Sequence, residues 1–459
     1  MVRIFNHYFN ANVVLQMALD FVFVLLTLLG FAAFYMQNAN DVVESATQSL
    51  SLATWTFVVG SATGIYQESP ERSLQQAVTR ALVATVLVLP LTFIIFNLLP
   101  DHVTQSPAMA YAAMATVVAV IGHRSLAGRF GRSALLQSRI LILGTGPMAR
   151  QVSDSLMVSD PRAVIVGYFP GPNEKEHAVP ESQILTAGTS LVAAAQRAGV
   201  SEVVVALSER RSGSMSLRDL LECKVNGIRV SDLNTHFEKR LGQIRLDHVN
   251  AGWLIFGDGF NQGLLRTAIK RAFDLLCSAL LLVATAPVML LTILVIKLDS
   301  PGPLFYRQER VGLNGKRFDV IKFRSMRCDA EEDGNPRWAQ KSDDRTTRVG
   351  RLIRLMRIDE LPQIYNVFKG QMSMIGPRPE RPYFVDNLTH DIPYYAVRHS
   401  VKPGITGWAQ VRYQYGATVE DAKQKLQYDL YYVKNHSLFL DLLIAFETAS
   451  VVLTGKGAR

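Results

Sequence analysis

Two neighbouring carboxylates, Asp359 and Glu360, follow an arginine-rich segment and precede a proline-flanked arginine. We expect residues 361–368 to form a short helix, with a proline in its first turn and a Lys-Gly stop, so that both acids lie at its N-terminus. The partial positive charge at that end favours anions. A carboxylate there can attack phosphorus when cations offset its repulsion from a diphosphate, and the second acid can hold a divalent metal or move a proton. The alternative is an acidic helix cap beside solvated arginines.

Cations for such a phosphate site come from three elements. Residues 318–324 form a predicted strand whose alternation places Lys322 and Arg324 on one face. Both suit diphosphate oxygens, and both also suit solvent or lipid headgroups. Arg354 belongs to a series of arginines at steps of three in the preceding helix, whose first two members, Arg348 and Arg351, suit anionic lipid. Arg378 lies between two prolines, which fix φ and reduce the entropy lost on ordering, so it is suited to clamp a phosphate.

Five ordered motifs within residues 266–459 resemble signatures of the bacterial polyprenyl-phosphate hexose-1-phosphate transferases. They are KFRSM (322–326), IDELPQ (358–363), GPRP (376–379), KPGITGWAQV (402–411) and YYVKN (431–435). The resemblance implies transfer of a hexose 1-phosphate from a UDP-sugar, such as UDP-glucose or UDP-galactose, to undecaprenyl phosphate. This would be the initiating step of exopolysaccharide or capsule assembly. Residues 253–260 further resemble an exopolysaccharide-associated branch of the family.

The resemblance also implies roles for individual residues. Asp359 would be the nucleophile of a ping-pong reaction that forms an aspartyl phosphosugar, and Glu360 would assist it. Mg²⁺, held by these two acids, would neutralise the diphosphate. The expected phosphate ligands are Lys322, Arg324, Arg354, Arg378 and Arg412. Arg412 is the least direct match, because it stands near the place where the family more often has an Asn-Gly-Arg run.

Composition points to a membrane protein. The chain has 459 residues, 49% of them hydrophobic, yet its formal net charge is +9. We expect a lipid bilayer and no nucleic acid among its partners. Three widely spaced cysteines allow neither a disulfide framework nor a zinc site, which favours a reducing, cytoplasmic setting.

Four apolar stretches, at 13–36, 50–66, 81–99 and 108–122, are each close to the length that spans a bilayer. The first is too long for an ordinary signal-peptide core, so we interpret it as retained. Of the three connectors only the middle one contains arginine, and further arginines follow the fourth stretch, so both ends of this bundle, residues 1–132, should be cytoplasmic. The chain is thus expected in the bacterial inner membrane as a multi-pass protein.

Residues 133–235 are predicted to form a Rossmann-like parallel α/β domain, because apolar strands alternate with helical segments. After the first strand, Gly144, Gly146 and Ala149 form a G-x-G-x-x-A turn, so these are candidate nucleotide-binding residues. No acid follows the second strand to hold a ribose, which favours a structural or regulatory use. This domain and the bundle are also the predicted surfaces of a homo-oligomer. The rival function is a membrane-anchored nucleotide sensor or scaffold built on the Rossmann-like domain. A sugar-nucleotide dehydratase or epimerase is disfavoured, because no Tyr-x-x-x-Lys motif follows the glycine turn at the expected position.

A linker, residues 236–265, leads to the catalytic region, 266–459. There the apolar run 273–296 has basic flanks and contains Ala286-Pro287, with alanine where the family usually has serine. A helix that enters, bends at this break and leaves on the same side keeps the catalytic domain on the cytoplasmic face. The predicted fold class is therefore membrane α plus α/β: a four-helix transmembrane bundle, a Rossmann-like domain, a re-entrant helix and a membrane-associated, mostly helical catalytic domain.

Overall fold

The computed structural model describes residues 2–4, 7–9, isolated positions up to 54, and 138–249, 260, 263–327 and 345–454, with gaps at 160–162, 172–173, 175–176, 186–189, 208–216, 414–415 and 417. Strands β1 (Val2–Ile4) and β2 (His7–Phe9) precede the predicted bundle. That bundle and the glycine-rich part of the linker lie almost entirely outside the described residues, so both stay predictions. From residue 65 onward the chain divides into two compact units between Gly242 and Gln243.

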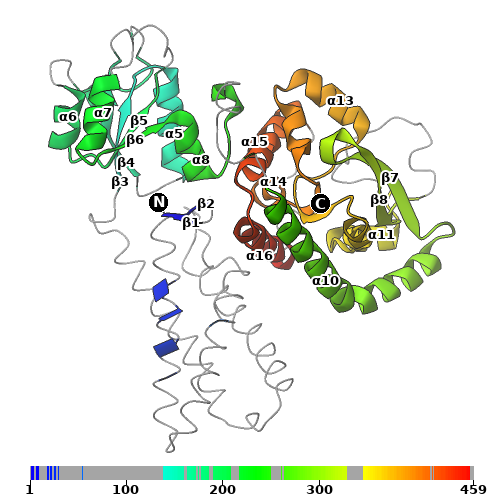
Figure 1. Cartoon of the computed structure of the whole chain (residues 1–459). Coiled ribbons are helices and arrows are strands. Elements are labelled where there is room, and N and C mark those ends of the chain that lie inside the picture. Colours follow the sequence, from blue (N-terminus) through cyan, green and yellow to red (C-terminus); the bar gives the residue numbers. More distant parts are fainter. Residues whose placement is uncertain are drawn as a thin grey trace, which may run out of the picture. The chain divides into compact units, whose positions relative to one another are not determined.

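The first unit is a doubly wound parallel sheet with the order β4-β3-β5-β6. Figure 1 shows α6 and α7 on one side of this sheet and α5 and α8 on the other. The elements are β3 (Ser138–Leu143), α5 (Pro147–Ser159), β4 (Ala163–Phe169), η2 (Glu181–Gln183), α6 (Leu191–Arg197), β5 (Glu202–Val205), α7 (Leu217–Val225), β6 (Arg229–Asp232) and α8 (Leu233–Leu241).

Strand β3 explains why both faces are covered, because its side chains are apolar in both directions. Ile140 and Ile142 pack in one buried cluster with residues of α5 and α8, such as Phe237. Leu141 and Leu143 pack in another with residues of α6 and α7. Successive strand residues point to opposite faces, so a run with no polar face needs helices on both. The predicted parallel α/β fold of this region is confirmed.

The second unit is mostly helical, as predicted. Its two small sheets pair β7 with β8 in antiparallel and β9 with β10 in parallel fashion. The elements are η3 (Leu246–His248), α10 (Leu264–Asp299), β7 (Phe305–Val311), η4 (Leu313–Gly315), β8 (Arg317–Phe323), α11 (Arg348–Leu355), η5 (Ile358–Gln363), α12 (Ile364–Phe368), β9 (Ser373–Ile375), α13 (Pro382–Asp391), η6 (Tyr395–Ser400), β10 (Gly404–Thr406), α14 (Trp408–Arg412), α15 (Val419–Asn435) and α16 (Leu438–Thr454). Trp408 and Tyr431 lie at the centre of its largest buried cluster.

Helix α10 is the one described helix long and apolar enough to cross a membrane, and only 11% of its most apolar window is buried. The predicted break at Ala286-Pro287 lies inside this helix, which continues on both sides of it. Figure 1 shows two helical segments that meet at an angle. Pro287 gives a cause for a bend, since proline removes one helix hydrogen bond and crowds the preceding turn. The re-entrant passage itself stays a prediction.

The C-terminal helix α16 combines a mostly apolar sequence with two acids. Its two acids, Asp441 and Glu447, are both buried, whereas Leu442 is exposed. Leu440 and Ile444 lie in the main core cluster. The helix therefore packs inward through a face that includes its acids.

Candidate active site

Asp359 and Glu360 lie in the first turn of η5, so their predicted position at the start of a helical segment is confirmed. This turn is a 3-10 helix that continues into α12, an arrangement common at helix N-termini. Arg357, with φ at 59°, adopts the left-handed conformation and separates α11 from η5. Both acids are only 8% exposed. Ionised acids at that depth require partners.

Glu360 finds two cationic partners from separate elements. The Lys322 ammonium, on β8, donates to its Oε1 at 2.9 Å, and the Arg378 guanidinium donates to the same oxygen at 2.7 Å. Burial alone would raise the pKa of Glu360, but Arg378 and Lys322 hold it well below its usual value. Burial lowers the pKa of Lys322, and Glu360 opposes that effect. Glu360 is thus an anion that binds two cations through one carboxylate oxygen.

Asp359 has the opposite environment. Its Oδ1 is buried and accepts no hydrogen bond from any residue that the structure describes. Burial, followed by the charge of Glu360, raises the pKa of Asp359, although Lys322, Arg354 and Arg357 oppose the rise. A poorly solvated carboxylate oxygen is a better nucleophile than a solvated one. Two adjacent acids whose pKa values are driven apart are typical of sites that assign them different roles.

A magnesium ion shared with a substrate fits these acids. Mg²⁺ is usually held by one or two carboxylates together with substrate phosphates and water. Asp359 offers an unpartnered oxygen for this purpose. The described residues do not form a complete protein cage for a metal, because no group of three or more suitable His, Cys, Asp or Glu side chains occurs among them.

The turn that presents Arg378 is locked against the segment before α14. Gly404 N–H donates to Pro377 O at 3.0 Å, and Gly376 N–H donates to Thr406 O at 2.9 Å. A side chain at Gly404 would place its Cβ 2.1 Å from Gly376 N. Glycine is therefore required for this close approach. The GPRP and KPGITG motifs, which are separate in the sequence, form one packed unit in the structure.

Helix α10 holds the other end of the segment that carries the acids. The Arg271 guanidinium donates to the carbonyl oxygens of Val367 at 2.6 Å and Phe368 at 2.8 Å, at the C-terminus of α12. One residue earlier, Lys270 bridges Asp274 and Asp441 at 3.0 and 2.9 Å. Helix α10 is thus joined by direct hydrogen bonds to the C-terminal end of the helical segment that begins with Asp359 and Glu360.

The predicted phosphate ligands divide into two groups. Lys322 and Arg378 meet at Glu360, and Arg354 is half-buried and close enough to affect Asp359 electrostatically. Arg324 lies just past β8, where its guanidinium donates to the carbonyl oxygens of Ser300 and Pro301.

Arg412 also has partners of its own, since it donates to Glu447 at 2.7 Å and lies 4.3 Å from the centre of the Trp408 ring. The phosphate roles of Arg324 and Arg412 stay predictions, and these contacts give both residues a structural use.

The sequence interpretation missed two arginines near the site, of which Arg398 is buried and Arg310 is partly buried. Arg310, on β7, donates to Pro379 O at 3.0 Å, and Arg398, in η6, donates to Arg378 O at 2.9 Å. Neither lies in a motif that indicates chemistry. The one available signal is that Arg398 shortly precedes the KPGITG motif.

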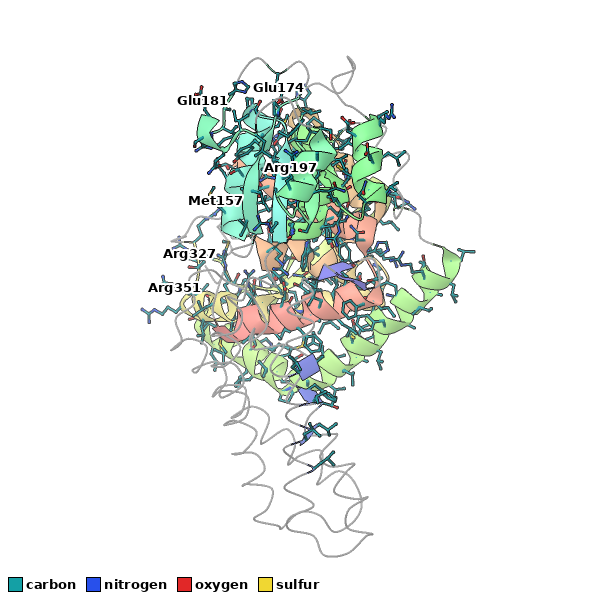
Figure 2. All side chains as sticks on the ribbon, turned by 90° about the vertical axis from the view of Figure 1, so that its left-hand side faces the viewer. Met157, Glu174, Glu181, Arg197, Arg327 and Arg351 are labelled. Atoms are coloured by element: carbon teal, nitrogen blue, oxygen red, sulfur yellow. The ribbon has the colours of Figure 1, made fainter. Side chains whose placement is uncertain are left out.

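The glycine turn of the α/β unit holds a carboxylate of the chain itself. Gly144 has φ at 130°, as such a turn requires. Glu174, labelled in Figure 2, accepts hydrogen bonds from Thr145 N–H at 2.6 Å, the Thr145 hydroxyl at 3.0 Å and Gly171 N–H at 3.2 Å. Thr145 directly precedes Gly146, one of the candidate nucleotide-binding residues, and its donors bind this internal anion. Nucleotide binding at the turn stays a prediction.

Comparison with known proteins gives two family matches. Residues 265–455 match the bacterial sugar transferase family, and residues 61–230 match a CoA-binding domain. The chain is 44% identical over 242 residues to the UDP-N-acetylgalactosamine-undecaprenyl-phosphate N-acetylgalactosaminephosphotransferase of Aeromonas hydrophila, covering 53% of this chain and 56% of that protein.

Two further relatives match a shorter stretch. Over 192 residues the chain is 46% identical to the UDP-glucose:undecaprenyl-phosphate glucose-1-phosphate transferase of Caulobacter vibrioides, covering 41% of this chain and 71% of that protein. Over 195 residues it is 43% identical to the exopolysaccharide production protein PSS of Rhizobium leguminosarum bv. phaseoli, covering 41% of this chain and 98% of the relative. The chain belongs to the bacterial sugar transferase family.

Proposed function

We propose that this protein transfers a hexose 1-phosphate from a UDP-sugar to undecaprenyl phosphate, the initiating step of exopolysaccharide or capsule assembly. The observation that carries the proposal is the unpartnered, buried oxygen of Asp359 beside a Glu360 that gathers Lys322 and Arg378. The names of the relatives support both the donor and the acceptor. They differ in the sugar, which includes glucose and N-acetylgalactosamine.

In the first step, a carboxylate oxygen of Asp359 attacks the β-phosphorus of the UDP-sugar. The new bond joins that oxygen to phosphorus, and the bond between phosphorus and the bridging oxygen breaks, so UMP leaves with the electron pair. Lys322, Arg354 and Arg378 bind phosphate oxygens and offset the repulsion between the carboxylate and the diphosphate. The enzyme then carries an acyl phosphate that bears the sugar.

In the second step, a phosphate oxygen of undecaprenyl phosphate attacks the same phosphorus. The bond to Asp359 breaks, which restores the carboxylate and releases a sugar-bearing undecaprenyl diphosphate. Glu360 assists by holding the cations in place or by moving a proton. Asp359 and Glu360 would hold Mg²⁺, which would supply further charge neutralisation when bound.

The second unit is proposed to lie at the cytoplasmic face of the bacterial inner membrane, with α10 as a re-entrant helix. Helix α11 supports this placement. Leu352 and Leu355 are exposed on it, and Met356 is exposed directly after it. Arg351 projects outward from the same helix, as Figure 2 shows. Exposed apolar and basic side chains on one helix suit the boundary between anionic headgroups and acyl chains.

For the α/β unit we propose a structural or regulatory role. The hydrogen bonds between Glu174 and the glycine turn favour this role over tight dinucleotide binding. Oligomer formation through this unit and the predicted bundle belongs to the same proposal. A nucleotide sensor or scaffold without transfer activity is the second candidate, and the CoA-binding family match is the observation that favours it.

One assay tests the function directly. Purified protein with Mg²⁺, undecaprenyl phosphate and a panel of UDP-glucose, UDP-galactose and UDP-N-acetylgalactosamine should release UMP from at least one of these sugars. Asp359→Asn should release none, because an amide cannot form the acyl phosphate. A sensor or scaffold would release no UMP from any of them. Turnover by Asp359→Asn within a few-fold of the parent would remove Asp359 from the role of nucleophile.

A further inference from the structure

The turn from Pro377 to Glu380 makes an unusual demand on its surroundings. Its two prolines have no N–H, so the turn has few donors of its own while each residue still exposes a carbonyl oxygen. Each of the four carbonyl oxygens accepts a hydrogen bond from a residue outside the turn. The donors, in order, are Gly404 N–H, the Arg398 guanidinium, the Arg310 guanidinium and Val311 N–H.

Arg398 donates a hydrogen bond to Arg378 in this turn, and further hydrogen bonds hold the Arg398 side chain in place. It is 5% exposed. Its Nη2 donates to Arg378 O at 2.9 Å and to Asp429 Oδ2 at 2.8 Å. Its Nε donates to the same Asp429 oxygen at 3.0 Å, and its Nη1 donates to the Tyr395 hydroxyl at 3.0 Å. A planar guanidinium is suited to such use, because its donors keep a fixed geometry.

We propose that Arg398, oriented by Asp429, is a positioning residue that holds the Arg378 backbone so that the Arg378 guanidinium reaches Glu360 and the substrate diphosphate. This inference rests on the proposed function. Arg398 acts on the reaction only through Arg378, because its hydrogen bonds go to the carbonyl of that residue, to Asp429 and to Tyr395. An error of about 1 Å in such a group can cost about a hundredfold in rate.

A double-mutant cycle on the full-length protein tests this. Arg398→Lys keeps the positive charge but loses the planar guanidinium that binds three partners at once. Arg378→Gln removes the guanidinium proposed to bind the diphosphate. UMP release is measured with the best UDP-sugar of the panel at saturating undecaprenyl phosphate. Arg398→Lys should lower kcat/KM by about tenfold to a hundredfold, with a higher KM for the UDP-sugar and an unchanged KM for the lipid.

The decisive variant combines both changes. Once the Arg378 guanidinium is gone, misplacing it costs nothing, so the double variant should be within about threefold of Arg378→Gln alone. Multiplicative losses would overturn the inference, because Arg398 would then act by general stability or by a separate route. If Arg378→Gln retains full kcat/KM, the phosphate role of Arg378 in the proposed function fails, and the positioning role fails with it.

Two controls keep the outcome readable. Arg317→Lys makes the same exchange in the same unit at an exposed ion pair with Glu309, and it should leave all parameters unchanged. If Arg398→Lys does not fold, Asp429→Asn replaces it in the cycle. That variant keeps the shape but weakens the orientation of Arg398, so the same lack of additivity with Arg378→Gln is expected, and additive losses again overturn the inference.

Discussion

Exchanging Asp359 and Glu360 separately for their amides should change stability in opposite directions, although both changes remove activity. Glu360→Gln leaves the partly buried cations Lys322 and Arg378 near each other without their shared counter-ion. Asp359→Asn removes a charge that burial and Glu360 already disfavour. We therefore expect Glu360→Gln to destabilise the protein at neutral pH, and Asp359→Asn to be neutral or stabilising.

The size of the Glu360→Gln effect follows from its two hydrogen bonds. A hydrogen bond to a charged group contributes about 1.5–3 kcal/mol, and a neutral acceptor retains about half of that. Arg378 is 31% exposed at its side chain, so solvent reduces its share. The loss is then about 1–2.5 kcal/mol, which for a unit of this size is roughly 2–10 °C in apparent Tm.

The two acids also predict different pH dependences. The pKa of Glu360 is lowered in the folded state, so its contribution is present at neutral pH and is lost only as the pH falls below about 4 and through the folded pKa. The pKa of Asp359 is raised, so its ionisation costs stability as the pH rises through that value. The advantage of Asp359→Asn should thus be greatest at neutral pH and disappear below about pH 4.

Thermal unfolding of the two variants and the parent in detergent, followed from pH 3.5 to 8 at one scan rate, measures these differences. Arg317→Lys provides the baseline for a change outside the site. Equal destabilisation by Glu360→Gln and Asp359→Asn at neutral pH would refute the opposite environments assigned to the two acids. So would a stability difference between Asp359→Asn and the parent that grows as the pH falls.

Three further outcomes are expected. A chain that begins at Gly263 should retain UMP release in detergent, since the matched region alone covers 98% of the Rhizobium relative; a well-folded but inactive product would give the α/β unit a part in transfer. Arg271→Gln should lower the stability by about 2 kcal/mol, because two carbonyl oxygens at the end of α12 lose a charged donor, and an unchanged Tm would contradict this. A single cysteine near Lys297, in a cysteine-free background, should react with an impermeant thiol reagent only after cell lysis, whereas labelling in intact cells would mean that α10 crosses the membrane fully.

The sequence was sufficient to predict the elements whose pattern is local. Period-two alternation located β8 to within one residue, and the position of the acids at a helical start followed from the proline and the Lys-Gly stop. The alternating segments around Gly144 predicted the parallel sheet. These features depend on neighbouring residues only, so a single sequence contains them.

Features that depend on distant contacts were not predictable in this way. The partners of Arg324 are carbonyl oxygens at the end of α10, and that end lies more than 20 residues earlier in the chain. Alternation predicted a face for Arg324 but could not indicate which groups that side chain would meet. The same limit applies to Glu174, whose hydrogen bonds to the glycine turn bridge 29 residues.

The 3-10 form of η5 explains how one dipeptide can supply two roles. In this helix successive side chains are about 120° apart, so neighbours face different surroundings. Glu360 therefore points to the cations of β8 and the Arg378 turn, while Asp359 Oδ1 points to a buried place without a hydrogen-bond donor among the described residues. Because Glu360 already holds the cations, they are in position before the diphosphate arrives, and the substrate meets a preorganised charge instead of having to assemble it. Replacing the pair by Glu-Asp would keep the net charge but exchange the two environments, so charge alone would not restore the site.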